Sequence, residues 1–340
     1  GMPSECQIIG NSLACKGITL STPVECLPLS TSMSKISIAN GSPNWYDGLV
    51  FWNSRLWTIG SPDGVNSYIH FSDDGVTWYR GANIKQSDAS TPLLYKRLFV
   101  HSDGKIYLLI QYQSAGLFKR KLLSSYDGGT WNMVNNDLNG RIGLYSEVVS
   151  FNGKLWIIGA EDVPTDFMKV YVSPDSGITW WTPAVSMNIP PRTSFATTVY
   201  KNKLWIIGGQ DAVSGRGFND VWNLSPTSSA WINIKPNTAP SLPRMIETDI
   251  GLRRMDHHII VYGDKLWVVG GKILEGNMPN ARMMYSSDGV TWKFSDFSTL
   301  TFIGASPDYT EVRGAVAFRG NIILNVWGPN YQGVWKSSCQ

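Results

Sequence analysis

Apolar runs that end at glycine recur along this chain at intervals of about 50 residues. The clearest run is residues 203–209, KLWIIGG, which is followed by residues 219–222, NDVW, and then by Trp231. An apolar run stopped by glycines, a second short strand and a lone tryptophan describe one small antiparallel sheet. Similar runs begin at Arg55, Lys105, Lys154, Lys265 and Asn321.

Six such units predict an all-β fold, a six-bladed β-propeller built from four-stranded antiparallel blades. Aligned second strands carry a large side chain at the same place, namely Trp57, Tyr107, Trp156, Trp205, Trp267 and Ile323. We therefore expect residues 33–340 to form a single propeller. Residues 1–32 show no period and are expected to form an irregular, cysteine-containing N-terminal extension.

The last repeat provides only three strands, which we expect at residues 313–318, 321–327 and 332–337. Residues 34–40 alternate in polarity as a strand does, and they precede the first full repeat. This orphan strand is expected to add to the last blade and to close the ring.

Four repeats share a turn between their third and fourth strands with Ser, Asp, Gly, Thr and Trp in fixed order. The turns are residues 72–78, 125–131, 173–180 and 286–292. The aspartate accepts backbone N–H bonds, the glycine supplies a positive φ, and the tryptophan packs against a neighbouring blade. In the fourth repeat only Trp231 remains of this pattern.

These turns resemble the Asp-box (BNR repeat) of sialidase-like propellers, and the fourth repeat resembles the kelch motif. The resemblance covers residues 44–337 and implies a six-bladed propeller with a galactose oxidase-like fold. The copper site of galactose oxidase needs a cysteine within the repeats, and all four cysteines of this chain lie near its ends. We therefore expect no copper, no other metal and no cofactor.

Charged residues make up 16% of the chain, and the net charge is +3. Lysines and arginines are scattered singly, so we expect no nucleic-acid partner. No apolar run reaches the length of a transmembrane helix, so we expect no membrane span. Residues 2–26 lack a basic start followed by an apolar run, so no signal peptide is expected there. The composition suits a monomer.

The cysteines are Cys6, Cys15, Cys26 and Cys339. A disulfide could hold the two ends of the chain together, whereas free thiols would suit a reducing compartment. The wide spacing argues against a zinc site without excluding it. We favour a secreted, periplasmic or cell-surface location over a cytoplasmic one, and leave the thiol state open.

Innermost strands line the channel of a propeller, so polar residues where these strands begin are candidates for ligand binding. We single out seven such residues as ligand-binding candidates: Asp47, Arg97, Glu147, Arg192, Arg254, His257 and Arg313. Arginines beside carboxylates suit an anionic or polyhydroxy ligand. The same groups could instead pair with one another to stabilise the channel.

Four residues could take part in catalysis: Glu147, Tyr145, Asp256 and His258. Sialidases use an arginine triad, a tyrosine with a glutamate and an acidic residue, but their Arg-Ile-Pro signature is missing here. Kelch-type sialate mutarotases resemble this chain better, since ring opening of an acidic sugar needs only general acid and base groups. Adjacent strand residues point to opposite faces, so His257 and His258 are not expected to share one metal.

Most tryptophans occupy repeated positions and are expected to be core plugs. Trp45, Trp52, Trp181 and Trp327 break the period and are candidates for exposed platforms that stack on a sugar, although Trp52 could pack between blades. We favour a non-catalytic recognition propeller that binds a glycan or a protein at the mouth of the channel. The alternative is a glycan-active enzyme on an acidic sugar.

Overall fold

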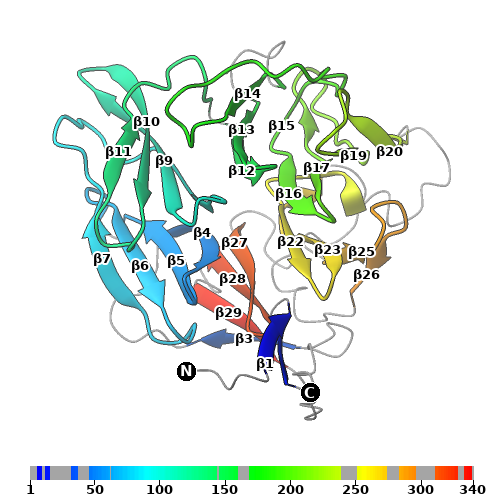
Figure 1. Ribbon diagram of the computed structural model, residues 1–340, viewed down its shortest axis with the longest axis horizontal. Helices are drawn as coiled ribbons and strands as arrows, with labels where there is room; N and C mark the ends of the chain where they lie inside the picture. The colour runs from blue at the N-terminus through cyan, green and yellow to red at the C-terminus, as the bar shows by residue number, and fades with distance from the viewer. Residues whose placement is uncertain are drawn as a thin grey trace.

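The computed structural model describes residues 6–9, 12–15, 32–36, 46–61, 63–143, 145–159, 168–238, 251–273, 283–295, 311–327 and 333–338. Within these ranges the named elements are strands, and six antiparallel sheets stand around a common axis (Figure 1). The chain is therefore a six-bladed β-propeller, as the repeats predict.

Each of the first three blades follows chain order from the axis outward. Blade 1 contains β4 (Tyr46–Trp52), β5 (Arg55–Gly60), β6 (Tyr68–Ser72) and β7 (Tyr79–Asn83). Blade 2 contains β8 (Tyr95–Val100), β9 (Ile106–Ser114), β10 (Leu117–Ser125) and β11 (Asn132–Asn135). Blade 3 contains β12 (Glu147–Phe151), β13 (Lys154–Ile158) and β14 (Val170–Ser173).

The remaining blades have four strands each. Blade 4 contains β16 (Ala196–Tyr200), β17 (Lys203–Ile207), β19 (Val221–Leu224) and β20 (Ile232–Lys235). Blade 5 contains β22 (His258–Tyr262), β23 (Lys265–Val269), β25 (Met284–Ser286) and β26 (Lys293–Phe294). Blade 6 contains β27 (Glu311–Phe318), β28 (Asn321–Trp327), β29 (Gly333–Ser338) and β3 (Ser32–Ile36).

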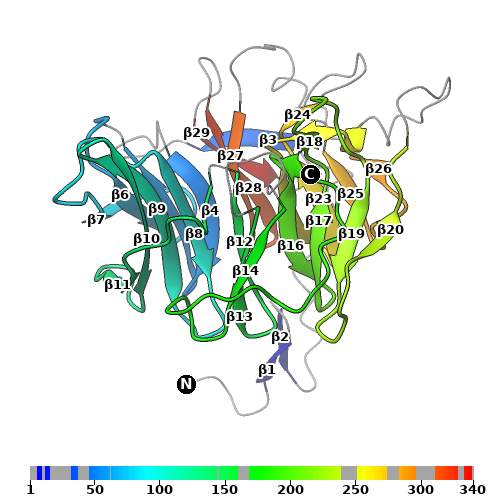
Figure 2. The ribbon, with the colours of Figure 1, turned by 90° about the horizontal axis from the view of Figure 1, so that it is seen from above.

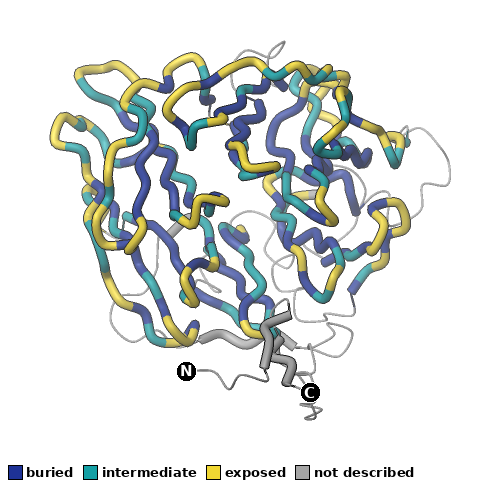
Figure 3. Tube along the Cα trace, viewed as in Figure 1, coloured by how far each residue is buried: buried dark blue, intermediate teal, exposed yellow. Residues whose placement is uncertain are grey.

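The innermost strands β4, β8, β12, β16, β22 and β27 close a ring, because each contacts the next and β27 contacts β4. β3 pairs antiparallel with β29, with Ser34 opposite Lys336. The predicted closure by an N-terminal strand is therefore confirmed, although the strand lies at 32–36 and only partly overlaps the expected 34–40. The central strands carry most of the buried residues, and the loops carry most of the exposed ones (Figure 3).

Blade 3 departs from the predicted four strands. Its fourth position is reduced to a single bridge, in which Val172 and Trp181 exchange two backbone hydrogen bonds of 2.8 Å. Pro183 follows two residues later and has no N–H to donate, so the ladder cannot continue past Trp181 in the usual way.

The shared turns have the geometry expected of them. In blade 2, Gly128 N donates to Ser125 Oγ, while Gly129 N and Thr130 N donate to one carboxylate oxygen of Asp127. The indole N–H of Trp131 donates to Gly128 O at 3.0 Å. Equivalent bonds from indole to glycine carbonyl occur at Trp78, Trp180 and Trp292. Each turn thereby fixes its tryptophan.

A second set of tryptophans sits in the second strands of the blades. The Trp57 indole N–H donates to the carbonyl of Trp52, five residues earlier, at 2.9 Å. Trp156, Trp205 and Trp267 repeat this bond. These side chains are buried in the clusters that join neighbouring blades, so the sheets adhere through aromatic contacts.

The expected N-terminal extension contains one regular element. β1 (Cys6–Ile9) pairs with β2 (Ser12–Cys15) as an antiparallel hairpin, with Cys6 opposite Cys15. In Figure 2 this hairpin projects from one end of the ring. The Gly-Asn connection in the sequence, typical of hairpins, is the signal that sequence reasoning missed. Two further two-stranded pairs, β15 (Arg192–Thr193) with β18 (Gln210–Asp211) and β21 (Arg254–Met255) with β24 (Lys272–Ile273), lie beside blades 4 and 5.

Among the residues that the structure describes, no helix has both the length and the apolar character needed to cross a bilayer.

Candidate functional site

We call the end of the ring where the innermost strands begin the mouth. The second strands end there too, because each pairs antiparallel with an innermost strand. The predicted site residues of the described chain all lie on segments at this end. Their side chains nevertheless differ in burial and in hydrogen-bond partners, and only some of them are accessible to solvent.

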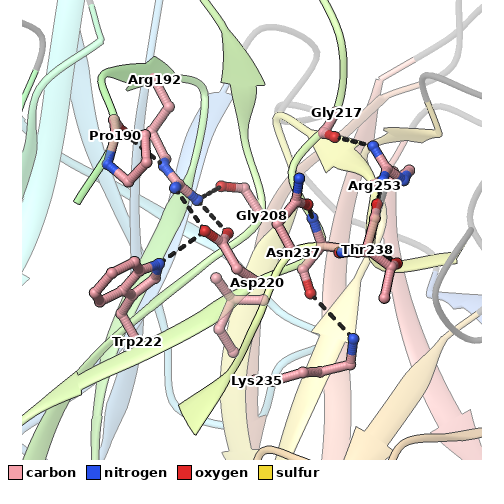
Figure 4. Close-up of polar contacts among 12 residues, drawn as sticks. Pro190, Arg192, Gly208, Gly217, Asp220, Trp222, Lys235, Asn237, Thr238 and Arg253 are labelled. Carbon is pink, nitrogen blue, oxygen red and sulfur yellow. Dashed lines mark hydrogen bonds and ion pairs between the residues drawn. The ribbon is translucent and has the colours of Figure 1, made fainter. Parts of the chain in front are cut away.

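Arg192 is enclosed by the protein. Its guanidinium makes a bidentate ion pair with Asp220, at 2.5 and 2.9 Å, and both side chains are almost fully buried (Figure 4). The same guanidinium donates to Gly208 O at 3.0 Å and stacks 3.9 Å from the ring centroid of Phe218. The Trp222 indole donates to Asp220 at 2.8 Å. Arg192 therefore ties blade 4 together from a buried position, and its ligand-binding role stays a prediction.

Arg254 is equally enclosed. Its side chain is fully buried and donates to Gly251 O at 2.5 Å and to Gly270 O at 3.0 Å. The preceding Arg253 is also buried and donates to the carbonyls of Gly217 and Thr238 (Figure 4). Gly251 O and Gly270 O, which accept from the Arg254 guanidinium, thus belong to its own segment and its own blade, and the ligand-binding role of Arg254 stays a prediction.

The two adjacent histidines face opposite neighbours. The ring Nε2 of His257 lies 2.9 Å from Ile207 O in blade 4, and that of His258 lies 2.7 Å from Val312 O in blade 6. They therefore do not converge on one metal, as the strand alternation predicts. Burial, aided by the Arg254 charge, lowers the pKa of His257 to about 3, so this ring is neutral. His257 joins blades 4 and 5.

Arg97 and Glu147 meet between blades 2 and 3. Arg97 Nη2 donates to Glu147 Oε1 at 3.0 Å, and 35% of the Arg97 side chain and 17% of the Glu147 side chain remain accessible. Nearby, the hydroxyl of Tyr95 donates to Ser146 O at 2.8 Å. Unlike Arg192, this pair keeps part of its surface in the channel.

Two carboxyl groups at the mouth are shifted in the same direction. Burial raises the pKa of Glu147, Arg97 opposes this shift, and the charge of Asp256 adds to it. Burial also raises the pKa of Asp256, which stands on a different blade. Both carboxyl groups therefore favour the protonated form more than an exposed carboxyl does.

Arg313 lies on the opposite side of the mouth. Its guanidinium stacks 4.8 Å from the Trp327 ring centroid and lies 3.4 Å from a carboxylate oxygen of the exposed Glu311. With Lys96 it lines a cavity of about 410 Å³ between blades 1, 2 and 6. The other described residues that line this cavity are Ser61, Gly64, Pro92 and Leu93.

Two predicted residues remain. Tyr145 is 45% exposed at the mouth. Asp47 lies on β4, opposite Ile59, but its side chain is outside the described part of the structure.

The tryptophans that break the period have different surroundings. Trp52 is buried and donates to Gly104 O of blade 2 at 3.0 Å, so it packs between blades. Trp327 supports Arg313, and Trp181 is 64% exposed. Trp45 lies outside the described residues. Within the part of the chain that the structure describes, no group of three His, Cys, Asp or Glu side chains could hold a metal ion.

Sequence reasoning missed Asp220 as a partner of Arg192 and Lys96 as a cavity residue of equal standing with Arg313. The Asn-Asp pair at 219–220 was the available signal for the first, since it stands immediately before a buried strand. Nothing in the sequence links Lys96 to Arg313, because the cavity that both line brings the second blade beside the last.

Comparison with known proteins agrees with the architecture. Residues 144–233, which span blade 3 and nearly all of blade 4, match a family described as the DUF6242 beta propeller domain. A search of curated proteins finds no match to the chain. The kelch and Asp-box resemblances stay predictions from the sequence, whereas the β-propeller is supported by both the fold and the family match.

Proposed function

We propose that the chain is a recognition propeller that binds an acidic polyhydroxy ligand, such as an acidic sugar on a glycan, at the mouth. The observation that carries this proposal is the cavity lined by Lys96 and Arg313. Its volume of about 410 Å³ falls in the range of small-molecule sites. The exposed Glu311, whose carboxylate lies 3.4 Å from the Arg313 guanidinium, is a group with which the ligand would compete.

The chemistry of this lining suits such a ligand. The Arg313 guanidinium presents a planar fork that can bind a carboxylate through two hydrogen bonds, and Lys96 adds a second positive charge. The Arg313 guanidinium stacks on Trp327, and this contact limits its orientations. Pro92 and Leu93 offer apolar surface to a sugar ring, and the Ser61 hydroxyl can bond to a ligand hydroxyl.

The test is calorimetric titration with N-acetylneuraminate, glucuronate and galacturonate, with glucose and galactose as neutral controls whose binding should not depend on Lys96 or Arg313. We expect an acidic sugar to bind and each of Lys96→Ala and Arg313→Ala to weaken binding about tenfold or more, as loss of a charged hydrogen bond does. Arg80→Ala removes an exposed arginine on the outer strand of blade 1 and should leave binding unchanged. Binding that ignores Lys96 and Arg313 would contradict the proposal.

A carboxylate on a protein partner would satisfy the same cations. If no acidic sugar binds, a peptide array rich in Asp and Glu, probed with the wild type and with Arg313→Ala, separates a protein ligand from a glycan. Arg313-dependent capture of acidic peptides would replace the glycan by a protein at the same site.

The second candidate is a glycan-active enzyme on an acidic sugar, favoured by the raised pKa values of Glu147 and Asp256. Opening and closing of a sugar ring needs one group that donates a proton and one that accepts it. NMR of any bound reducing sugar would report whether its anomers interconvert faster with protein. Acceleration lost in Glu147→Gln but binding retained would favour the enzyme, and binding without acceleration would favour recognition.

A further inference from the structure

Two consecutive tryptophans in blade 3 have opposite environments. Trp180 is 7% exposed and its indole donates to Gly177 O, as in the other shared turns. Trp181 is 64% exposed, but its backbone N–H and C=O both bond to Val172 at 2.8 Å. The backbone is thus held while the indole faces outward.

A cavity of about 260 Å³ opens beside this indole. It lies between blades 3 and 4, where the fourth strand of blade 3 is reduced to the bridge at Trp181. Its apolar wall comes from Trp156, Val172, Pro174, Pro183, Val185 and Pro226. Its polar groups come from Asn152, Lys154, Ser225 and Ser228.

This cavity is separate from the site proposed at the mouth. Asn152 lies in the turn between β12 and β13, where the innermost strand ends. Lys96 and Arg313 lie near the beginnings of their innermost strands, at the other end of the ring. The two cavities therefore share no lining residue and open at different ends of the blades.

We propose that Trp181 and this cavity form a second binding site, for one pyranose ring of a neutral saccharide. A pyranose has an apolar face of C–H groups and a rim of hydroxyls. The Trp181 indole offers a flat surface to the apolar face, and the amide, hydroxyl and ammonium groups of the lining can bond to the rim. The volume lies just below the range of drug-sized sites, which suits a single ring.

A proline-rich peptide is the rival occupant, since such peptides dock in grooves lined by aromatic residues. Those grooves are lined by several aromatic side chains and hold the peptide as an extended polyproline II helix. Here one exposed tryptophan stands beside a small cavity, and its neighbours include proline rings and polar side chains. The geometry therefore favours a compact ring over an extended peptide.

The test is saturation-transfer difference NMR, followed by calorimetric titration, with methyl β-glucoside, methyl β-galactoside, N-acetylglucosamine and decaproline. We expect at least one saccharide to bind, with Trp181→Ala weakening it about tenfold or more and Trp181→Phe retaining part of the affinity. Tyr126→Ala removes an aromatic that is 71% exposed on blade 2 and serves as the matched control. The bonds to Val172 use the Trp181 backbone, so Trp181→Ala should stay folded.

Arg313→Ala separates the two sites, because it should weaken acidic-sugar binding at the mouth about tenfold or more and leave neutral-saccharide binding unchanged. Trp181-dependent saccharide binding that Arg313→Ala does not affect supports the proposal. Three outcomes overturn it: no saccharide binds at concentrations of tens of millimolar, a saccharide binds equally well to Trp181→Ala, or decaproline alone binds in a Trp181-dependent manner.

Discussion

The indole of Trp57 in blade 1 lies against the α-carbon of Gly128 in blade 2. A β-carbon built on Gly128 would stand 2.1 Å from Cη2 of Trp57, which is far inside van der Waals contact. Gly289 meets Trp205 in the same way between blades 4 and 5, at 2.4 Å. At Gly128 and Gly289 the glycine is thus needed for two reasons, its positive φ and the close approach of a neighbouring tryptophan.

We predict that Gly128→Ala lowers the free energy of unfolding by about 2–4 kcal/mol, because both backbone strain and overpacking act at this position. The matched control is Gly129→Ala, one residue later. There the nearest atom to an added β-carbon is a carboxylate oxygen of Asp127, at 3.8 Å. Urea unfolding of both variants gives the comparison, and equal stability of the two would contradict the packing argument.

The buried pair of Arg192 and Asp220 should be important for stability. Asp220→Ala leaves a guanidinium without its carboxylate in the interior, so we expect a loss of about 3–5 kcal/mol. Arg55 and Asp73 form an ion pair of similar length, 2.6 Å, at the surface. Asp73→Ala should cost less than about 1 kcal/mol, because solvent screens the exposed pair. Thermal denaturation of both variants tests the contrast, and similar melting temperatures would refute it.

Because β3 closes the ring, we predict that an N-terminally truncated protein stays soluble and unfolds cooperatively only if it retains β3. Deletion of residues 1–40 removes β3 and leaves β29 as an open edge, so we expect aggregation or a non-cooperative thermal transition. Deletion of residues 1–31 retains β3 and should give a monodisperse, cooperatively unfolding protein. Size-exclusion chromatography with light scattering distinguishes the two. A soluble, cooperative 1–40 deletion would show that β3 is dispensable for closure.

The lowered pKa of His257 predicts that the folded protein loses stability in mild acid. Its pKa is about 3 in the folded protein and 6.5 without burial, so the unfolded chain binds a proton that the folded chain excludes between these values. The resulting loss of stability as the pH falls from 6.5 towards 3 amounts to at most about 4 kcal/mol. His70, whose pKa burial lowers to about 4, acts in the same direction.

Urea midpoints measured at pH 7.5, 6.0 and 4.5 for the wild type and for His257→Gln test this prediction. The variant starts from lower stability, because its contact with Ile207 O changes, but its stability should fall less with pH. Glu147 and Asp256 act in the opposite direction, since a raised folded pKa lets the protein gain stability as these groups protonate. An unchanged pH slope in His257→Gln would contradict the assignment to His257.

The repeat pattern was sufficient to predict the ring, because each blade is built from local hairpins and shared turns. The residues of the mouth were harder to assign. Arg192 and Arg254 precede the innermost strands of blades 4 and 5, and regular strand alternation continued back to them would give each side chain a direction. In the structure, Ser194 and Asp256 have positive φ values of 56° and 55°, which break that alternation before β16 and β22 begin. A side chain before such a kink cannot be assigned a direction by counting.

Contacts between residues far apart in the sequence are the second reason why the site could not be fully predicted. The carboxylate that pairs with Arg192 belongs to Asp220, three strands further along the chain, and Lys96, which lines the same cavity as Arg313, belongs to blade 2. Neither relationship has a periodic signature in the sequence. The only sign in the sequence of the reduced fourth strand of blade 3 is Pro183, which lacks an N–H. Its effect on the ladder becomes clear only from the structure, in which Val172 pairs with Trp181.

The strand that completes blade 6 has a consequence for biosynthesis. β3 leaves the ribosome before any innermost strand, yet its partner β29 is among the last segments to be made. Blades 1 to 5 can acquire their hairpins during translation, whereas β3 must wait beside a growing chain for its neighbour. Until then one side of the nascent protein stays open, and a chaperone that shields β3 would act over most of the time needed for synthesis.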